Sequence, residues 1–176
     1  MGFHFDFHSL DSTRDLRPLV DFIASQDLRY PRYDDWVQRT EHELEKGYKR
    51  AIMAFSSGKL VGDAIYQRHK APELSSFLEI KNLRVDPTVR DRYIASFMLR
   101  QIEAENRNSY DAIIVDARPT ELSIISFLES CGFRQIAKVP LYDKDVQEVT
   151  MTKFLKRSRS ELLDSIAHKV IISQAL

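Results

Sequence analysis

The sequence predicts an α/β (α+β) fold in which helices flank one mixed sheet, followed by an extra C-terminal helix. Apolar residues recur with a period of two in some segments and with helical spacing in others. The segments follow each other as β-α-α-β-β-β-α-β-α-β-β before the final helix, an order typical of a sheet covered by helices. The 176 residues suffice for one domain with a sizeable core, and we find no internal repeat.

The first half of the chain supplies two helices and four strands. The stretch FHFDFH, residues 3–8, alternates like a half-buried strand. A helix follows, with capping-box spacing at Ser12 and Asp15. A second helix should end just before Gly47. The remaining strands are expected at residues 50–57, 60–69 and 77–85.

The second half alternates helices and strands. A continuous apolar run at residues 111–117 is typical of a strand buried on both faces. The next helix should end at Gly132, and closing strands are expected at residues 133–139 and 147–155. Two further helices are predicted from their apolar stripes, the last capped by Ser158 and Glu161. The stripes are Ile94, Phe97, Met98 and Ile102, and then Leu163, Ile166, Ala167 and Val170.

Composition excludes several classes of protein. Lys plus Arg and Asp plus Glu both number 26, so no global charge draws the chain to nucleic acid or to a membrane surface. The single cysteine, Cys131, rules out an internal disulfide framework and a Cys-based zinc site. His4 and His8 share a strand face but lie ~13 Å apart, too far for one metal. We expect no metal, no membrane span or signal peptide, and a cytoplasmic location.

The stretch DPTVRDRYIA, from Asp86 to Ala95, joins a predicted strand to a predicted helix. A helix start exposes backbone N–H groups and the positive end of the macrodipole, so it can bind an anion. Arg90 and Arg92 could add charge-assisted contacts to phosphate oxygens. Alternatively the stretch is a solvated loop whose arginines pair with Asp86 or Asp91.

This stretch resembles motif A of the GNAT superfamily of acyl-CoA-dependent N-acyltransferases. That motif is an apolar-x-Val-x-Pro strand end followed by Arg/Gln-x-x-Gly-x-Gly/Ala, and the matching residues here are Leu83, Val85, Pro87, Arg90 and Ala95. The stretch FLESCGF, residues 127–133, is similar to the family's second signature. The resemblance implies a mainly antiparallel central sheet and a GNAT-like domain at residues 1–155. Residues 156–176 would then form a helix that packs on this domain or on another subunit.

The resemblance also implies acetyl-CoA as cosubstrate and a cradle for it. The backbone of residues 82–85 would lie along the pantetheine. The cofactor-binding residues would be Leu83, Arg84, Val85, Arg90, Asp91, Arg92, Tyr93, Ile94 and Ala95.

Two departures from the family pattern bear on activity. Tyr93 stands where the family usually has glycine, which approaches a pyrophosphate closely and adopts positive φ without strain. We expect Tyr93 to be already helical, so that only its ring must swing aside. Leu128 replaces the tyrosine that often protonates the departing thiolate, and this helix is expected to be core packing, with Cys131 a small apolar residue.

Other side chains are candidates for the chemistry. Glu79 occupies a strand position where some relatives carry a catalytic glutamate; it would be the general base, or alternatively a surface partner of Lys81. Tyr142, placed between the last two strands, is the candidate general acid, or alternatively a loop anchor. The acceptor-binding residues by resemblance are Tyr30, Tyr33 and Trp36, which could equally be helix packing.

The sequence therefore predicts an N-acetyltransferase that moves an acetyl group from acetyl-CoA to a primary amine by direct attack. The alternative is a module of the same fold that has lost catalysis and senses acyl-CoA or binds a partner. Tyr93, Leu128 and Glu121 favour this alternative, while Glu79 and motif A favour the enzyme. Expected partners are acyl-CoA and an amine acceptor, without nucleic acid or membrane. The final helix must bury its stripe on the domain or in a homodimer.

Overall fold

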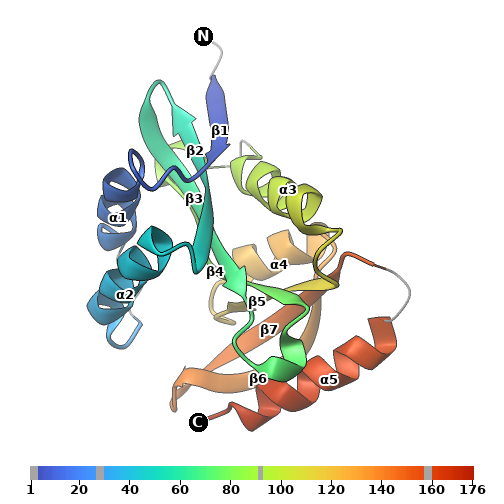
Figure 1. Ribbon diagram of the computed structural model, residues 1–176. Coiled ribbons are helices and arrows are strands. Elements are labelled where there is room, and N and C mark those ends of the chain that lie inside the picture. The colour runs from blue at the N-terminus through green and yellow to red at the C-terminus, as the bar shows by residue number, and fades with distance from the viewer. Residues whose placement is uncertain (1–3, 27–29, 91–92, 157–159) are drawn as a thin grey trace. The chain divides into compact units, whose positions relative to one another are not determined.

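The computed structural model describes residues 4–26, 30–90, 93–156 and 160–176 (Figure 1). In them the strands form a seven-stranded sheet of order β1-β2-β3-β4-β5-β7-β6. The pairs β1–β2, β2–β3, β5–β7 and β6–β7 are antiparallel, and β4–β5 is parallel. The predicted mixed, mainly antiparallel sheet with helices is thus confirmed.

The elements have the following bounds. They are β1 Phe5–Ser9, α1 Leu16–Ala24, α2 Tyr33–Glu45, β2 Lys49–Ser56, β3 Lys59–Arg68, the 3-10 turn η1 Pro72–Leu74, β4 Phe77–Val85, the 3-10 turn η2 Pro87–Val89, α3 Ile94–Asn106, β5 Ala112–Ala117, α4 Leu122–Ser130, β6 Arg134–Asp143, β7 Val146–Phe154 and α5 Ser160–Ser173.

The chain divides into two compact units. The first unit comprises Met1–Gln67 and Lys81–Ala104, and the second comprises Arg68–Ile80 and Glu105–Leu176. Strand β4 therefore contributes its first residues to the second unit and its last residues to the first. Each unit has a hydrophobic core of its own.

The core of the first unit lies between β2, β3 and the helices α1 and α2. Its members from the two helices are Leu19, Val20, Ile23, Val37 and Leu44. Helix α3 lies on the opposite side of these strands (Figure 1). Gly62 of β3 permits its close approach, because a Cβ there would stand 3.3 Å from Ile94 Cγ2 and 3.1 Å from the Arg84 carbonyl oxygen.

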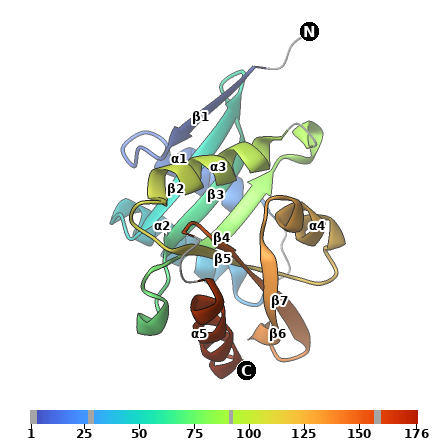
Figure 2. The same cartoon turned by 90° about the vertical axis from the view of Figure 1, so that its right-hand side faces the viewer.

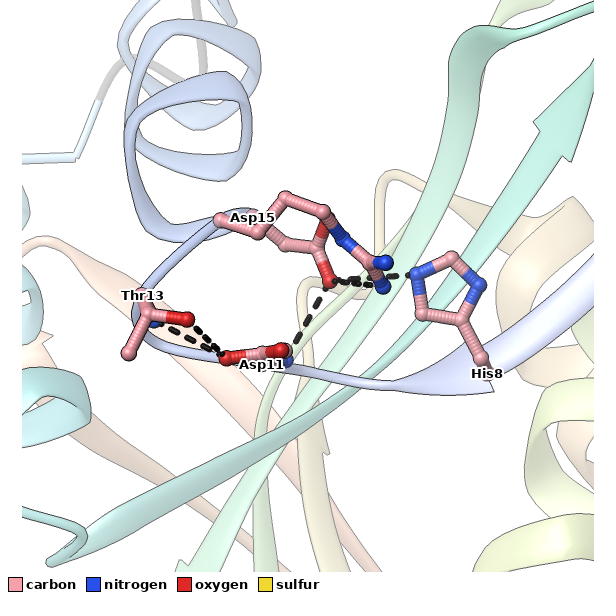
Figure 3. A network of polar contacts seen from close by, with 5 residues as sticks. His8, Asp11, Thr13 and Asp15 are labelled. Atoms are coloured by element: carbon pink, nitrogen blue, oxygen red, sulfur yellow. Dashed lines mark hydrogen bonds and ion pairs between the residues drawn. The ribbon is translucent and has the colours of Figure 1, made fainter.

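The entry to α1 differs from the predicted capping box. In the turn before the helix, Asp11 Oδ1 accepts from the Thr13 amide at 3.0 Å and from the Thr13 hydroxyl at 2.7 Å. Asp15 accepts from the Asp11 amide at 3.2 Å and lies 3.2 Å from His8 Nε2 (Figure 3). The predicted capping box is wrong, because the residue that precedes the helix is Asp15, whose side chain makes no capping hydrogen bond.

The C-terminus of helix α2 and the turn between β2 and β3 both contain residues with positive φ. Gly47 has φ 74°, and the Tyr48 amide donates to the Glu43 carbonyl at 2.8 Å, which is a Schellman motif after α2. Ser57 (φ 52°) and Gly58 (φ 77°) join Ser56 to Lys59 in a two-residue turn. Positive φ at both central residues matches the twist of a hairpin.

The core of the second unit joins α5 to β5, β6 and η1. Ala167 and Ile171 of α5 are buried with Phe77, Ala112 and Ile114. Figure 2 shows α5 at the same end of this unit as β6, and the Leu176 amide donates to the Pro140 carbonyl at 2.9 Å. The apolar stripe of α5 therefore packs within its own chain. Ser158, the predicted cap, lies outside the described residues.

Two details of the predicted elements are wrong. Phe97 was placed in the buried stripe of α3, yet it is 52 % exposed and packs its ring 5.4 Å from that of Phe7. Leu99 is buried instead. Strand β6 continues to Asp143, four residues beyond its predicted end, because β7 keeps pairing with it as far as Val146.

Candidate active site

The segment that links β4 to α3 is held by Asp86. Its Oδ1 accepts from the Thr88 amide at 2.9 Å and hydroxyl at 2.7 Å, and these bonds lower the pKa of Asp86. The Asp86 amide donates to the Val61 carbonyl at 2.8 Å, which fixes the end of β4 against β3. Asp86 is thus occupied by its own turn and by Lys59, at 3.4 Å, and it does not pair with Arg90.

Arg90 follows this turn and is exposed. Its Nε donates to the Val85 carbonyl at 3.4 Å, a long bond, so its guanidinium keeps donors for an anion. Leu83, Arg84 and Val85, just before the turn, are each half-buried. Asp91 and Arg92, which were predicted to complete the cradle, lie outside the described residues.

Tyr93 is not helical, so that prediction is wrong. Its φ is 61°, a left-handed conformation that costs a non-glycine residue about 1–2 kcal/mol. Its carbonyl accepts from the Phe97 amide at 2.9 Å and the Ser96 hydroxyl at 2.8 Å, so the residue caps α3. The ring is 78 % exposed. The helix therefore starts at Ile94, and the tyrosine backbone adopts the shape for which glycine is better suited.

Ile94 and Ala95 are the first helical residues of α3. The Ile94 side chain is 2 % exposed and faces Gly62, so it belongs to the core and only its backbone remains for binding. Ala95 is half-buried. A helix N-terminus can bind an anion, and Arg90 precedes this one in the sequence, so the binding of phosphate by this segment stays a prediction.

Asp63 is a titratable group of the first unit that the sequence prediction missed. It lies in the middle of β3 with 0 % exposure, and Asn82 Nδ2 donates to its two carboxylate oxygens at 2.8 and 3.1 Å. Burial raises the pKa of Asp63 to about 7, against the opposing effects of Asn82, Gln26 and Arg84. A charged residue inside the apolar stretch LVGDAIY was the signal that could have found it.

The aromatic residues predicted to bind the acceptor also pack in the first unit. Tyr33 and Trp36 stack at 5.4 Å and lie against the core of α1 and α2. The Tyr33 hydroxyl donates to the Ile23 carbonyl at 2.8 Å. Burial, followed by the charge of Asp63, raises the pKa of Tyr33 to about 12. Tyr30 precedes α2 and is half-buried.

Glu79 is a half-buried residue of β4 in the second unit, in register with Ile114 of β5. Its strand neighbours Leu78 and Ile80 are buried and point to the other face. The carboxylate therefore lies on the face of the strand that retains some exposure.

Tyr142 lies in β6, not in a loop between strands. Its hydroxyl donates to Asp116 Oδ2 at 3.1 Å, and Thr150 donates to Asp116 Oδ1 at 2.6 Å. Tyr142 is 40 % exposed. These bonds fix a phenol beside a carboxylate in the second unit, and Asp116 was not identified from the sequence.

A second buried carboxylate, Glu148, accepts from the Leu141 amide at 2.9 Å. Burial raises its pKa, while the Arg118 guanidinium, 3.9 Å away, opposes that shift. Within the described ranges, no group of three His, Cys, Asp or Glu side chains could hold a metal ion. Over those same residues, no helix is long and apolar enough to cross a membrane.

Known proteins resemble this chain in sequence profile and in fold. A profile described as acetyltransferase (GNAT) family matches residues 13–133, which is more than half of the 176 residues. The chain belongs to the acetyltransferase (GNAT) family. It is accordingly an acyltransferase, and the family uses acetyl-CoA. No curated protein sequence matches it.

Solved structures of GNAT proteins share the fold at low identity. A GNAT-family protein from Desulfovibrio desulfuricans superposes with a TM-score of 0.73 at 14% identity, covering 87% of this chain and 100% of that one. The ribosomal-protein-S18-alanine N-acetyltransferase from Escherichia coli gives 0.69 at 16%, covering 88% and 96%. The Salmonella typhimurium protein yncA, solved with acetyl-CoA, gives 0.66 at 14%, covering 87% and 95%.

The second GNAT signature serves packing in this chain. Leu128 is fully buried, Ile124 and Phe127 are half-buried, and Gly132 has φ 89° where α4 ends. Cys131 carries a free, half-buried thiol. A leucine cannot donate a proton, so the acid of this GNAT enzyme must be another group.

Proposed function

We propose that this GNAT enzyme transfers an acetyl group from acetyl-CoA to a primary amine by direct attack, without a covalent enzyme intermediate. The observation that carries the proposal is the β4–η2–α3 segment, where exposed Arg90 stands before the N-terminus of α3. The family match supports the acyl transfer. The neighbour solved with acetyl-CoA and the neighbour that is an N-acetyltransferase support the donor and the kind of acceptor.

Several backbone groups of this segment suit a pantetheine and a pyrophosphate. We assign the half-buried strand residues Leu83, Arg84 and Val85 to the pantetheine. The guanidinium of Arg90 and the first amides of α3, at Ile94 and Ala95, would bind phosphate oxygens. The positive φ at Tyr93 turns the chain into α3, and the residue is 78 % exposed.

Acetyl-CoA supplies a thioester carbonyl when bound, and the chain supplies the proton transfers. Glu79 would take a proton from the acceptor ammonium, directly or through water, so that a neutral amine attacks the carbonyl carbon. A strand N–H of β4 would donate to the carbonyl oxygen as it becomes negative. As the carbon–sulfur bond breaks, Tyr142 would protonate the leaving thiolate, and its phenolate would take the second proton that the attacking nitrogen loses when the amide forms. Asp116 would hold the Tyr142 hydroxyl in place.

Thiol release from acetyl-CoA, measured over a panel of primary amines, tests this assignment. Glu79→Gln should lower kcat by about 10²–10⁴-fold with an unchanged Kd for acetyl-CoA, because it removes a base and not a binding group. Glu73→Gln is the matched control, since Glu73 is an exposed glutamate of the same unit. A Glu79→Gln enzyme with the wild-type rate would remove Glu79 from the mechanism.

The strained Tyr93 and the buried Leu128 favour one second candidate, a GNAT protein that binds acyl-CoA as a sensor. It predicts tight binding of acetyl-CoA with no thiol release for any amine. The enzyme predicts release with at least one acceptor in the panel.

A further inference from the structure

Strand β1 is the first strand in the order of the sheet, so one of its edges has no neighbouring strand among the described residues. An edge of this kind presents unpaired backbone groups and can pair with another chain. Many sheet edges are protected by proline, lysine or a bulge, yet β1 has the sequence FDFHS and pairs with β2 without a register shift. β6, at the other end of the order, differs, because its Pro140 carbonyl accepts from the Leu176 amide at 2.9 Å.

The hydrogen bonds between β1 and β2 show which backbone groups of β1 point outward. The Leu10 amide donates to the Ala51 carbonyl at 2.9 Å, so these two residues form a hydrogen-bonded pair. Hydrogen-bonded and non-hydrogen-bonded pairs alternate along antiparallel strands. The backbone N–H and C=O groups of Phe7 and Ser9 therefore point away from β2, to the open edge. In the described part of the chain, no backbone group bonds to these outward-facing atoms.

The side chains of β1 divide between the two faces of the sheet. The Phe7 ring lies on the face of α3, with its centroid 5.4 Å from that of Phe97, which is 52 % exposed. Asp6 and His8 lie on the opposite face. Asp6 is exposed. His8 Nε2 lies 3.2 Å from Asp15, and Figure 3 shows the second ring nitrogen of His8 turned away from that carboxylate. The open edge thus carries an acidic side chain and an imidazole two residues apart.

Two copies of β1 can pair about a twofold axis in only a few registers. Antiparallel pairing through the open edge must place outward-facing residues opposite each other. In the register centred on Phe7, Asp6 of each copy lies opposite His8 of the other, so a pair of opposite charge forms twice. The neighbouring registers, centred on Asp6 or on His8, place two carboxylates or two imidazoles opposite each other, and like charges there are destabilising. The side chains therefore select the register centred on Phe7.

We propose that the chain forms a twofold homodimer in which β1 pairs antiparallel with β1 of a second copy, centred on Phe7. The Phe7 amide of each copy donates to the Phe7 carbonyl of the other. The two pairs of Asp6 and His8 occupy non-hydrogen-bonded positions, where opposite side chains approach most closely, and His8 Nδ1 is the donor to Asp6. On the other face the two Phe7 rings, each beside its own Phe97, form one aromatic cluster. The self-complementary charges favour a second copy over a strand of another protein.

Sedimentation equilibrium of the full chain tests the dimer. The mass of the wild type should rise with concentration from 20.5 kDa toward twice that value. Asp6→Lys should raise the Kd of the dimer about tenfold or more, because it turns both attractive pairs into repulsive ones. Asp21→Lys, the same change of charge at an exposed residue of α1 in the same unit, should leave this Kd unchanged. A wild type that stays monomeric, or a dimer that the two substitutions affect equally, overturns the inference.

Disulfide trapping tests the register, in a Cys131→Ser chain that has no other thiol. Phe7→Cys places two thiols on directly opposite residues, whose Cα atoms stand about 5.5 Å apart as a disulfide requires, so oxidation should give a covalent dimer. Asp6→Cys should not, because its two copies are diagonal neighbours about 7–8 Å apart. Circular dichroism checks that each variant is folded. A covalent dimer from Asp6→Cys in place of Phe7→Cys, or from neither, contradicts the inference.

Discussion

Replacing Asp63 with asparagine should stabilise this protein at neutral pH, although the change removes a residue that accepts hydrogen bonds in the core. Burial raises the pKa of Asp63 from 3.8 to about 7. The folded chain therefore binds this proton more tightly than the unfolded chain. Ionisation of Asp63 at neutral pH then costs free energy of folding.

The magnitude follows from the shift. A rise of about 3 pKa units, at 1.36 kcal/mol each, corresponds to about 4 kcal/mol. The proton on Asp63 contributes this stability in full below pH 3.8, the contribution falls as pH rises toward 7, and it is absent above the folded pKa. An asparagine side chain never ionises, so a chain with Asp63→Asn should keep its stability across this window. The amide of the new residue can also hydrogen-bond to Asn82.

Urea unfolding at several pH values between 4 and 8 measures the difference between wild type and Asp63→Asn. The free energy of unfolding of the variant, relative to that of the wild type, should rise by a few kcal/mol from pH 4 to pH 8. Asp21→Asn is the control, because its carboxylate is exposed and bonded to Arg17 at 3.0 Å, where a pair contributes little. A constant difference over the whole pH range, or a less stable Asp63→Asn chain at pH 8, would refute the reasoning.

Three further predictions concern other parts of the chain. Tyr93→Gly should raise the free energy of unfolding by about 0.5–1 kcal/mol in urea unfolding, because it relieves a left-handed residue, whereas Tyr93→Ala, which keeps the strain, should not. Tyr142→Phe should lower kcat by about 10²-fold or more, and Asp116→Asn should add little to it in the double variant, since both act on one proton; additive losses would contradict this. Ile171→Ala should cost about 2–4 kcal/mol by opening a cavity under α5, and Ile172→Ala, on the exposed face, less than about 0.5 kcal/mol; equal losses would mean that α5 does not pack as described.

Sequence periodicity was sufficient for the elements because most strands and helices of this chain bury one continuous face. The strand of residues 111–117 was predicted from an unbroken apolar run, and β5 is indeed buried along nearly its whole length. Gly47 and Gly132 were identified as helix ends, and both have positive φ. In each case one local requirement decided the structure.

The candidate site was less predictable, because it depends on tertiary context. The hydrogen bonds of Asp116 to Tyr142 and Thr150 join residues 26 and 34 positions apart. The importance of Asp63 depends on its burial and on its hydrogen bonds from Asn82, which lies 19 positions later in the chain. The backbone of Tyr93 was misjudged because propensity alone argues against a left-handed tyrosine, whereas the turn into α3 imposes one.

Tertiary context also explains the errors in the predicted helices and strands. Phe97 has the spacing of a core residue on α3, yet it packs against the ring of Phe7 at the surface. Strand β6 outlasts its apolar pattern because its hydrogen bonds to β7 continue. Apolar periodicity indicates which residues are buried but not which are hydrogen-bonded to a neighbouring strand. It therefore misplaces the end of a strand where pairing continues beyond the buried residues.

Calorimetric titration of the full chain with acetyl-CoA, repeated on Arg90→Ala and on Arg100→Ala, tests the central claim most directly. Both arginines belong to the first unit and both are exposed, but only Arg90 precedes the N-terminus of α3. The account predicts micromolar binding that weakens about tenfold in Arg90→Ala, the loss of one charge-assisted contact, and is unchanged in Arg100→Ala. No binding to the wild type, or equal weakening by both substitutions, would mean that this segment does not hold the phosphates of acetyl-CoA.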